Sequence, residues 1–370
     1  MEVKFLDLKA QYSSIKKEID NAIQSVIDKS AFSAGPFVES FERNFAGVHK
    51  AKFCLGVNSG TSALHLAMWA LGINADDEVI VPTNTFFATP EAVSLCSAQP
   101  VFVDCEPDYF NINPARIENV ITKKTKAIIA VHLYGQPAQL EEIKRVADQH
   151  NLLLIEDCAQ AHLAQYKGVP VGTAGICGCF SFYPSKNLGS YGEAGAVVTG
   201  DEQLFKKMLA IRDHGSTQKY HHDYIGHNYR MEGLQGAILD VKLKYLPQWT
   251  EKRRKNADLY RRYLADIEKV ISPNEMPDTR HVYHLFVVRA DKRDELKKYL
   301  NDHQIYTGIH YPIPCHFQKA YKSLYREAGN LPVSENLGDQ ILSLPMYPEL
   351  EENQIEYISR KICDFYSEQT

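Results

Sequence analysis

The chain has 370 residues, a length that predicts two domains at roughly 150 residues each. Its 44% apolar and 24% charged residues are typical of folded globular proteins, which excludes disordered, collagen-like and disulfide-scaffold classes. The chain carries 41 Lys and Arg residues against 46 Asp and Glu residues, a net charge of -5. Because no broad basic field is present, neither nucleic acid nor a membrane is expected as a partner.

The eight cysteines are scattered, and no C-x-x-C pair gives zinc or redox spacing. We expect most of them to be small buried hydrophobes. Residues 1–12 mix charged and apolar side chains and lack the apolar core of a signal peptide. No apolar run approaches the roughly 20 residues that span a bilayer. These features favour a reducing, cytoplasmic location.

Short runs that are apolar on both faces alternate with segments of helical periodicity. The runs cover residues 53–57, 78–82, 101–104, 127–133, 152–156, 179–183 and 196–199. The helical segments include residues 62–71, 140–150 and 204–212. This alternation predicts an α/β domain whose mostly parallel sheet is covered by helices on both sides.

The alternation of apolar runs and helical segments ends after Pro247. A charged helical stretch at 251–267 and a proline-containing joint are followed by a strand-like run at 281–289 and by helices at 293–303 and 354–367. We therefore predict a large domain over residues 1–248 and a small α+β domain over residues 249–370.

An amphipathic helix is expected near the N-terminus, at residues 12–29. Its apolar face consists of Ile15, Ile19, Ile23, Val26 and Ile27. We expect this face to pack on the small domain or on a partner chain.

Lys186 is the strongest candidate for a reactive group. It belongs to the motif S-F-Y-P-S-K-N (residues 181–187), where a strand runs into a turn that presents the lysine just beyond its end. Ligands of open α/β sheets gather at such strand ends, and a desolvated lysine amine attacks aldehydes. A loop lysine taken alone is more often a solvated surface charge, so the neighbouring motifs must decide.

Asp157 ends another apolar strand directly after Glu156, and strand alternation sends the two carboxylates to opposite sides. One of them can then face a ligand. A carboxylate beside a pyridine nitrogen keeps that nitrogen protonated and makes the ring an electron sink. The alternative role for Asp157 is to cap the following segment.

Residues 57–62 (V-N-S-G-T-S) lie between a strand and a helix. Gly60 allows backbone N–H groups to approach an anion, and Ser59 and Thr61 add hydroxyl donors at a helix N-terminus that favours phosphate. Simple helix capping is the alternative. The stretch is neither a Walker A nor a G-x-G-x-x-G motif, which weakens nucleoside-triphosphate and dinucleotide chemistry.

Phe86 belongs to T-F-F-A-T (residues 85–89), which follows the strand at 78–82 and places an aromatic ring at the same sheet edge. Stacking on a flat ligand would add about 0.5–1.5 kcal/mol beyond burial. A place in the apolar core is the alternative for this side chain.

The segment at 214–230 is rich in His, Tyr and Arg, and Tyr224 and Arg230 are candidates for contact with a diphosphate. The three histidines at 221, 222 and 227 lack the spacing and carboxylates of a metal site, so no metal is expected. The alternative is a flexible, solvated loop.

Together these motifs resemble the DegT/DnrJ/EryC1/StrS family of pyridoxal 5'-phosphate (PLP)-dependent sugar aminotransferases. The resemblance extends from residue 5 to about residue 312 and rests on ordered motifs, N-S-G-T-S-A-L-H-L-A, V-P-T-N-T-F-F-A-T, L-I-E-D-C-A-Q-A, S-F-Y-P-S-K-N and N-Y-R-M. It implies the PLP fold type I, with a mixed, mostly parallel seven-stranded sheet in a large domain and a small C-terminal α+β domain.

The resemblance also implies residue roles. Lys186 would hold PLP and transfer protons, and Asp157 would pair with the ring nitrogen. The remaining cofactor contacts would come from Gly60, Thr61 and Ser181 at the phosphate, Phe86 on the ring, Gln160 near the phenolic oxygen and Asn228 from a second subunit. A homodimer with shared active sites follows from the role of Asn228. Candidate substrate contacts are Tyr183, Tyr224, Arg230, His310 and Tyr311.

The reaction implied is transfer of the amino group of L-glutamate, through pyridoxamine 5'-phosphate (PMP), to a nucleotide-linked keto-sugar. Members that aminate the 3-keto group of dTDP-linked 6-deoxyhexoses look most similar, which implies a dTDP-3-amino-3,6-dideoxyhexose product for lipopolysaccharide or other glycans. A 4-keto substrate is one alternative. Related sugar dehydratases carry histidine in place of Lys186, so the lysine indicates amino transfer.

Two functions outside this activity are alternative hypotheses. The first is a non-catalytic regulator that keeps the PLP fold. The second is an α/β enzyme that uses a nicotinamide cofactor, which the missing glycine fingerprint disfavours.

Overall fold

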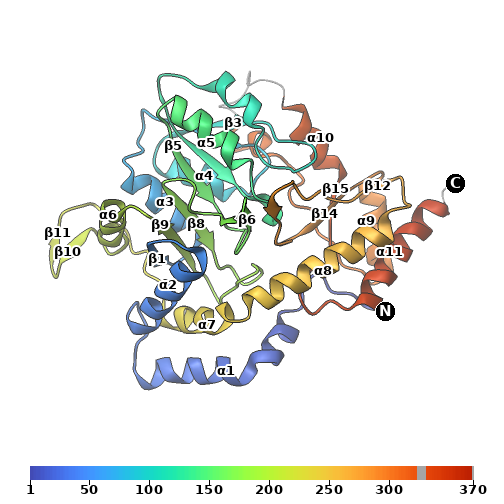
Figure 1. Ribbon diagram of the computed structural model, residues 1–370, viewed down its shortest axis with the longest axis horizontal. Coiled ribbons are helices and arrows are strands. Elements are labelled where there is room, and N and C mark those ends of the chain that lie inside the picture. The colour runs from blue at the N-terminus through green and yellow to red at the C-terminus, as the bar shows by residue number, and fades with distance from the viewer. Residues whose placement is uncertain (323–330, 369–370) are drawn as a thin grey trace.

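The computed structural model describes residues 1–322 and 331–368. A central sheet with helices on both sides forms the larger part, and helix α8 leads from it to a smaller group of strands and helices (Figure 1).

The central sheet has seven strands in the order β1-β9-β8-β5-β4-β2-β3. Neighbouring strands are parallel except at β9, which runs antiparallel to both β1 and β8. The strands are β1 (Phe53–Val57), β2 (Glu78–Pro82), β3 (Gln99–Val103), β4 (Thr125–Val131), β5 (Leu153–Asp157), β8 (Cys177–Ser181) and β9 (Gly195–Thr199). Each predicted apolar run forms one of these strands, so the mixed, mostly parallel sheet is confirmed.

Both faces of the sheet are buried, because successive strand residues enter opposite apolar clusters. Leu55 and Val57 pack with α3, α4 and α6, whereas Cys54 and Ile80 pack with α2, α5 and α7. The helices are α2 (Pro36–His49), α3 (Gly60–Ala70), α4 (Ala88–Leu95), α5 (Leu140–Gln149), α6 (Glu202–Arg212) and α7 (Gly233–Leu243). This two-sided burial explains why the strands read as continuous apolar runs.

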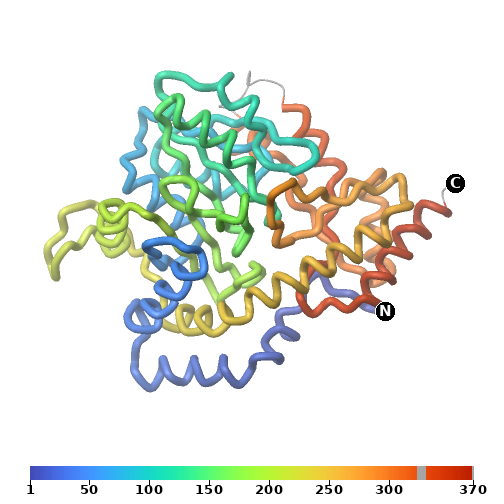
Figure 2. Tube along the Cα trace, in the orientation of Figure 1, coloured from blue at the N-terminus to red at the C-terminus, as the bar shows by residue number. Residues whose placement is uncertain are grey.

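The smaller group of elements is built around an antiparallel sheet, β12-β14-β15. Its elements are α8 (Leu246–Leu264), β12 (Val270–Ile271), β14 (Phe286–Ala290), α9 (Arg293–Asp302), α10 (Pro332–Gln340), β15 (Ile341–Leu344) and α11 (Glu352–Ser367). The N-terminus also joins this group, since Val3 forms a parallel bridge with Ile305 and lies in the same apolar cluster. The Cα trace shows both chain ends on this side of the molecule (Figure 2).

Short elements complete the fold. A small sheet contains β6 (Gln165–Tyr166), β7 (Val169–Pro170) and β13 (Thr279–Arg280), and a hairpin contains β10 (Ser216–Gln218) and β11 (His221–His222). The 3-10 helices cover Pro114–Arg116, Glu118–Val120, Leu133–Gly135 and Cys315–Phe317.

The predicted strand at residues 281–289 is wrong in its first half, because β14 begins only at Phe286. The preceding residues bond instead to the loop after β4. The N–H groups of Val282 and Leu285 donate to the carbonyls of Gly135 and Tyr134. The same segment therefore ties the smaller group to the edge of the central sheet.

Helix α1 (Leu8–Asp28) confirms the amphipathic helix, and within this chain its apolar face packs mainly on α7, with Trp249 as its contact from the predicted small domain. Ile15 and Ile19 are buried against Ile238 and Val241 of α7 and against Trp249. Figure 1 shows α1 running along α7, away from the smaller sheet.

The expected domain boundary near residue 249 falls inside α8. Trp249 packs with α1 and α7, whereas Ala257, Tyr260 and Leu264 of the same helix pack with β14 and α11. The division into residues 1–248 and 249–370 stays a prediction, and this change of packing partner is where it would lie.

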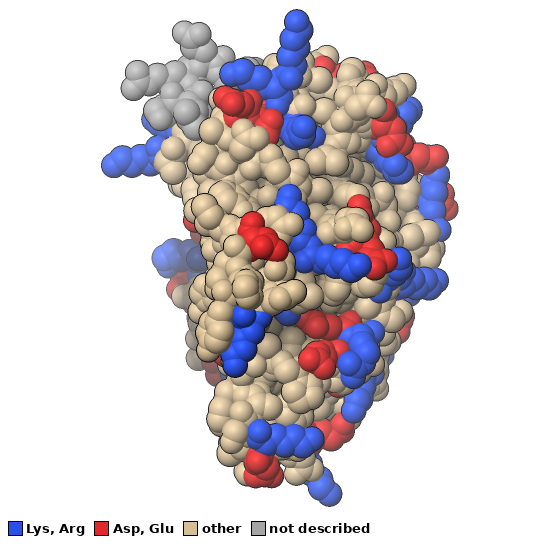
Figure 3. Space-filling model, turned by 90° about the vertical axis from the view of Figure 1, so that its left-hand side faces the viewer, with Lys and Arg blue, Asp and Glu red and all other residues tan. Residues whose placement is uncertain are grey.

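Seven of the eight cysteines are free and buried, as expected, and Cys363 is exposed. No helix of the described chain combines the length and apolarity needed to cross a membrane. On the face that carries the β10–β11 hairpin, acidic and basic side chains are interspersed and separated by uncharged surface (Figure 3).

Candidate active site

A cavity of about 530 Å³ lies at the carboxyl ends of the parallel strands. Its walls come from the N-terminus of α3, the loop after β2, the ends of β5 and β8, and the segment around residue 310. Ten predicted site residues line it: Gly60, Thr61, Phe86, Asp157, Gln160, Ser181, Tyr183, Lys186, His310 and Tyr311. This is where open α/β sheets bind their ligands.

Lys186 reaches the cavity from a tight turn after β8. Its backbone N–H donates to the carbonyl of Tyr183 at 2.8 Å. The loop depends on Gly189, because a Cβ there would lie 2.2 Å from the carbonyl oxygen of Pro184. Burial of the amine lowers the pKa of Lys186 to about 8, against the opposing charge of Asp157. A substantial fraction of the amine is therefore neutral and nucleophilic at mildly alkaline pH.

Asp157 lies at the last position of β5 and is 5% exposed. Its Oδ2 accepts a hydrogen bond from Thr89 Oγ1 at 2.8 Å, and its Oδ1 accepts one from the Ala159 N–H at 3.1 Å. Burial raises the pKa of Asp157, while these hydrogen bonds and the charge of Lys186 act in the opposite direction. The bond to Ala159 is the local cap considered for this residue, and the carboxylate still faces the cavity.

Glu156 points to the opposite side of the strand, as predicted, and is fully buried. Its carboxylate accepts hydrogen bonds from the N–H groups of Gly172, Ala174 and Gly175 and from His132 Nε2 at 3.0 Å. Burial raises the pKa of Glu156, but these donors outweigh it and the net pKa is lowered. Glu156 is therefore an anchor of the fold and not a cavity residue.

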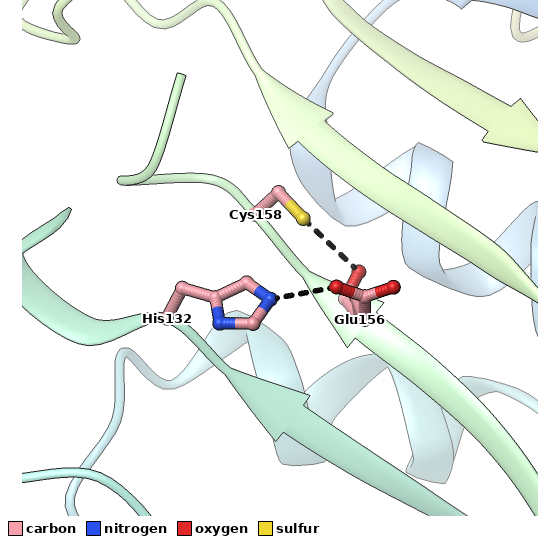
Figure 4. A group of neighbouring side chains, drawn as sticks. All are labelled: His132, Glu156 and Cys158. Atoms are coloured by element: carbon pink, nitrogen blue, oxygen red, sulfur yellow. Dashed lines mark hydrogen bonds and ion pairs between the residues drawn. The ribbon is translucent and has the colours of Figure 1, made fainter. Parts of the chain in front are cut away.

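His132, Glu156 and Cys158 lie close enough to suggest a metal site (Figure 4). Hydrogen bonds already occupy these groups, including the one from His132 Nε2 to Glu156. His132 Nδ1 accepts from the Ala138 N–H at 3.0 Å, and Cys158 Sγ lies 3.9 Å from the carbonyl oxygen of Glu156. Burial raises the pKa of the Cys158 thiol well above its ordinary value, which disfavours a thiolate ligand. We interpret this cluster as structural.

The N-terminus of α3 forms one end of the cavity. Ser59 caps the helix, accepting from the Ser62 N–H at 3.0 Å, and Gly60 and Thr61 line the cavity. A Cβ on Gly60 would lie 2.6 Å from the Cβ of Ser181, so only glycine allows this approach of α3 to the end of β8. Free N–H groups and the positive end of the helix dipole make this region suitable for a phosphate.

Aromatic and amide groups also line the cavity. The ring of Phe86 is 55% exposed and lies 5.6 Å from that of Tyr311, so it is not a core residue. Gln160 accepts from the Tyr134 N–H at 2.6 Å and donates to the hydroxyl of Tyr311 at 3.1 Å. The hydroxyl of Tyr134 donates to the carbonyl of His310. These bonds attach the segment around residue 310 to the central sheet.

Three predicted residues lie outside the cavity of their own chain: Tyr224, Asn228 and Arg230. They belong to the segment that carries the β10–β11 hairpin, whose side chain Tyr220 is 83% exposed. Arg230 forms an ion pair with Asp213 at the base of the hairpin.

Sequence reasoning missed several cavity residues. Thr89 belongs to the motif T-F-F-A-T (residues 85–89), and its spacing of four from Thr85 is consistent with two hydroxyls on one side of a helical turn. Glu193 and His284 also line the cavity. Neither carries a sequence signal, because each is brought there by packing between distant segments.

The cavity fits PLP on the residues present. It offers an amine with a lowered pKa, a buried carboxylate, an exposed aromatic ring and a helix N-terminus with a glycine approach. Fold and site together define a PLP-dependent enzyme of fold type I.

The chain belongs to the DegT/DnrJ/EryC1/StrS aminotransferase family, whose model matches residues 13–363. It is 44% identical to the pleiotropic regulatory protein of Geobacillus stearothermophilus over 99% of both chains. It is 43% identical to the dTDP-3-amino-3,4,6-trideoxy-alpha-D-glucose transaminase of Streptomyces venezuelae over 95% of this chain and 93% of the relative. The crystal structure of S. venezuelae DesV is similar over 98% of both chains, with a TM-score of 0.96 and 42% identity.

Further relatives are named for dTDP-, UDP- and GDP-linked sugars. The related structure of NtdA from Bacillus subtilis contains the bound cofactor PMP. The chain is a PLP-dependent sugar aminotransferase.

The approach of Gly60 to Ser181 gives a test of the phosphate end. Gly60→Ala is expected to weaken PLP binding by about tenfold, because overpacking of this kind costs about 1–3 kcal/mol. Absorbance titration of the apoprotein with PLP measures the Kd. Gly200→Ala is the matched control, since a Cβ there meets no atom within 4 Å. Equal affinity for both variants would contradict the assignment.

The pKa of Lys186 gives a second test. The rate at which apoprotein captures PLP is expected to rise with pH around a midpoint of about 8, because only the neutral amine attacks the aldehyde. The negative charge of Asp157 raises the pKa of Lys186, so Asp157→Asn is expected to move the midpoint to lower pH. Stopped-flow absorbance measures both profiles. Asp258→Asn, at a 76% exposed carboxylate, should leave the midpoint unchanged, and a shift in that control would refute the local origin of the effect.

Proposed function

We propose that this enzyme transfers the amino group of L-glutamate to a nucleotide-linked keto-deoxysugar, most simply a dTDP-3-oxo-6-deoxyhexose, to give a dTDP-3-amino-3,6-dideoxyhexose. The observation that carries the proposal is that Lys186 and Asp157 face one cavity at the sheet edge. Support for the sugar comes from the relative named for a dTDP-3-amino sugar.

PLP supplies an electron sink that accepts the pair released when a proton leaves the carbon bearing nitrogen. Lys186 Nζ would hold the cofactor, and its amine would move that proton. Asp157 would keep a proton on the ring nitrogen through opposite charge. Preorganised charge of this kind needs no reorganisation during the reaction.

The other cavity residues orient the cofactor. Gly60, Thr61 and Ser181 are placed for its phosphate, and Phe86 is placed to stack on its ring. Gln160 has an amide N–H group beside the hydroxyl of Tyr311 and is assigned to the phenolic oxygen.

Sugar contacts are assigned to residues near the reactive amine. Tyr183 is 50% exposed beside Lys186, and His310 and Tyr311 line the same cavity. These residues also suit a sugar with a 4-keto group, which is the second candidate substrate.

A non-catalytic regulator is disfavoured, although one relative is named a regulatory protein. A regulator has no need for a lysine with a lowered pKa, a buried carboxylate and an ordered Gln160 in one cavity.

Turnover with glutamate tests the assignment. Lys186→Ala is expected to lower the rate of 2-oxoglutarate release by about 10²–10⁴-fold, because proton transfer by a positioned group contributes that much. Lys298→Ala, at a 78% exposed lysine, is the control and should retain full activity. A panel of dTDP-, UDP- and GDP-linked 3-keto and 4-keto sugars, read by product mass and NMR, identifies the acceptor. Release of 2-oxoglutarate by Lys186→Ala at the wild-type rate would refute the role of the lysine.

The active enzyme is proposed to be a homodimer whose sites are shared. Asn228, Tyr224 and Arg230 lie away from the cavity of their own chain, on a segment whose side chains Tyr220 and Ile225 are 83% and 82% exposed. In the proposed dimer this segment reaches the cavity of the second subunit, where Asn228 meets the phosphate and Tyr224 and Arg230 meet the sugar diphosphate.

Mixed dimers test the sharing of sites. Lys186→Ala and Asn228→Ala homodimers are each expected to be impaired, whereas purified hybrid dimers should have about half of wild-type activity, because each hybrid contains one intact site. Activity is measured after co-expression and separation by two affinity tags. Hybrids as inactive as the parents would show that Lys186 and Asn228 serve the same subunit's site.

A further inference from the structure

Two buried threonine hydroxyls lie behind the carboxylate of Asp157. Thr85 and Thr89 are 4% and 1% exposed; Thr85 lies in the loop after β2, and Thr89, four residues later, lies in the first turn of α4. Thr89 Oγ1 donates to Asp157 Oδ2 at 2.8 Å, and the Oγ1 atoms of Thr85 and Thr89 are 2.9 Å apart. The backbone fixes Thr89 as well, since its N–H donates to the carbonyl of Phe86 at 3.1 Å.

The direction of this chain follows from counting protons. A threonine hydroxyl has one proton, and that of Thr89 is directed to Asp157. Thr85 must therefore donate its own proton to Thr89. The arrangement delivers a single donor to Asp157 Oδ2 and suits the ionised carboxylate, which only accepts.

The carboxylate keeps free capacity toward the cavity. Two ionised oxygens offer about four acceptor sites, of which Thr89 and the Ala159 N–H take two. A ring nitrogen that shares a proton with Asp157 therefore adds to these bonds and does not replace them.

We propose that Thr89, oriented by Thr85, is a positioning residue that fixes Asp157 and keeps the proton shared with the PLP ring on the ring nitrogen. The inference rests on the role given to Asp157 in the proposed function. A hydrogen bond to the ionised carboxylate stabilises it, so the proton stays on the nitrogen. Loss of the hydroxyl would move the proton toward the carboxylate and weaken the electron sink.

The electrostatic surroundings of Asp157 agree with this role. Burial raises the pKa of Asp157, and the hydrogen bond from Thr89 is the largest influence that lowers it. The charges that face the carboxylate from other elements are those of Lys186 and, when protonated, His132. Burial raises the pKa of the Tyr311 hydroxyl, and the nearby charge of Asp157 adds to that rise.

Three variants isolate the hydroxyl. Thr89→Val removes it at nearly constant shape, Thr89→Ser retains it, and Thr85→Val removes only its donor. Thr199→Val is the matched control, because Thr199 is 2% exposed and its Oγ1 donates to the carbonyl of Ile176 at 2.8 Å, outside the cavity lining.

Two measurements follow the effect. The pKa of Asp157 in the apoprotein is read by ¹³C NMR of labelled aspartate, with Asp157→Asn for assignment, and the Kd for PLP is read by absorbance titration. Thr89→Val is expected to raise the pKa of Asp157 and to weaken PLP binding by about tenfold, since the lost bond is to a charged group. Thr85→Val should change both in the same direction by a smaller factor. Thr89→Ser and Thr199→Val should stay close to wild type.

An unchanged pKa of Asp157 and unchanged PLP affinity in Thr89→Val, or equal impairment in Thr89→Ser, would overturn the inference. Failure of the underlying assignment looks different. If Asp157→Asn binds PLP as tightly as wild type and releases 2-oxoglutarate at the same rate, the role of Asp157 itself is refuted.

Discussion

The structure depends on burying one amine and one carboxylate at the same cavity, where burial favours the neutral form of each group and the charge of each favours the ionised form of the other. Burial lowers the pKa of Lys186 to about 8 and raises that of Asp157, while each group's charge opposes the shift of the other. Removal of either group would therefore change the pKa of the other. Because the two pKa values depend on each other, the positions of both groups must be fixed. Hydrogen bonds hold the turn after β8 and the carboxylate at the end of β5 in place.

The parallel direction of the strands in the central sheet brings the two groups together. Parallel strands β5 and β8 end at the same edge, so the residues that follow them converge although they are about 25 residues apart in sequence. The antiparallel strand β9 brings Gly195 to within reach of the backbone before α3, where a Cβ would meet the carbonyl oxygen of Ser59 at 2.3 Å. The phosphate end and the reactive amine are thus positioned by one set of strand pairings.

The sequence was informative where function follows from local periodicity and strand ends. Lys186 and Asp157 were predicted because each follows an apolar run, and the structure places both in the cavity. The partner of α1, the late start of β14 and the approach of His284 depend on contacts between distant segments, which periodicity does not encode. Thr89 is intermediate, since its spacing from Thr85 was visible but its contact with Asp157 required the fold.

The bonds of Tyr134 and Gln160 to the segment around residue 310 have a consequence for assembly of the protein. The cavity exists only after segments near positions 60, 160 and 310 have come together, and such long-range closure is slow. A cofactor that recognises this closed arrangement binds the native chain alone and stabilises it by mass action. PLP is therefore expected to stabilise the folded chain against unfolding by an amount that grows with the concentration of free PLP.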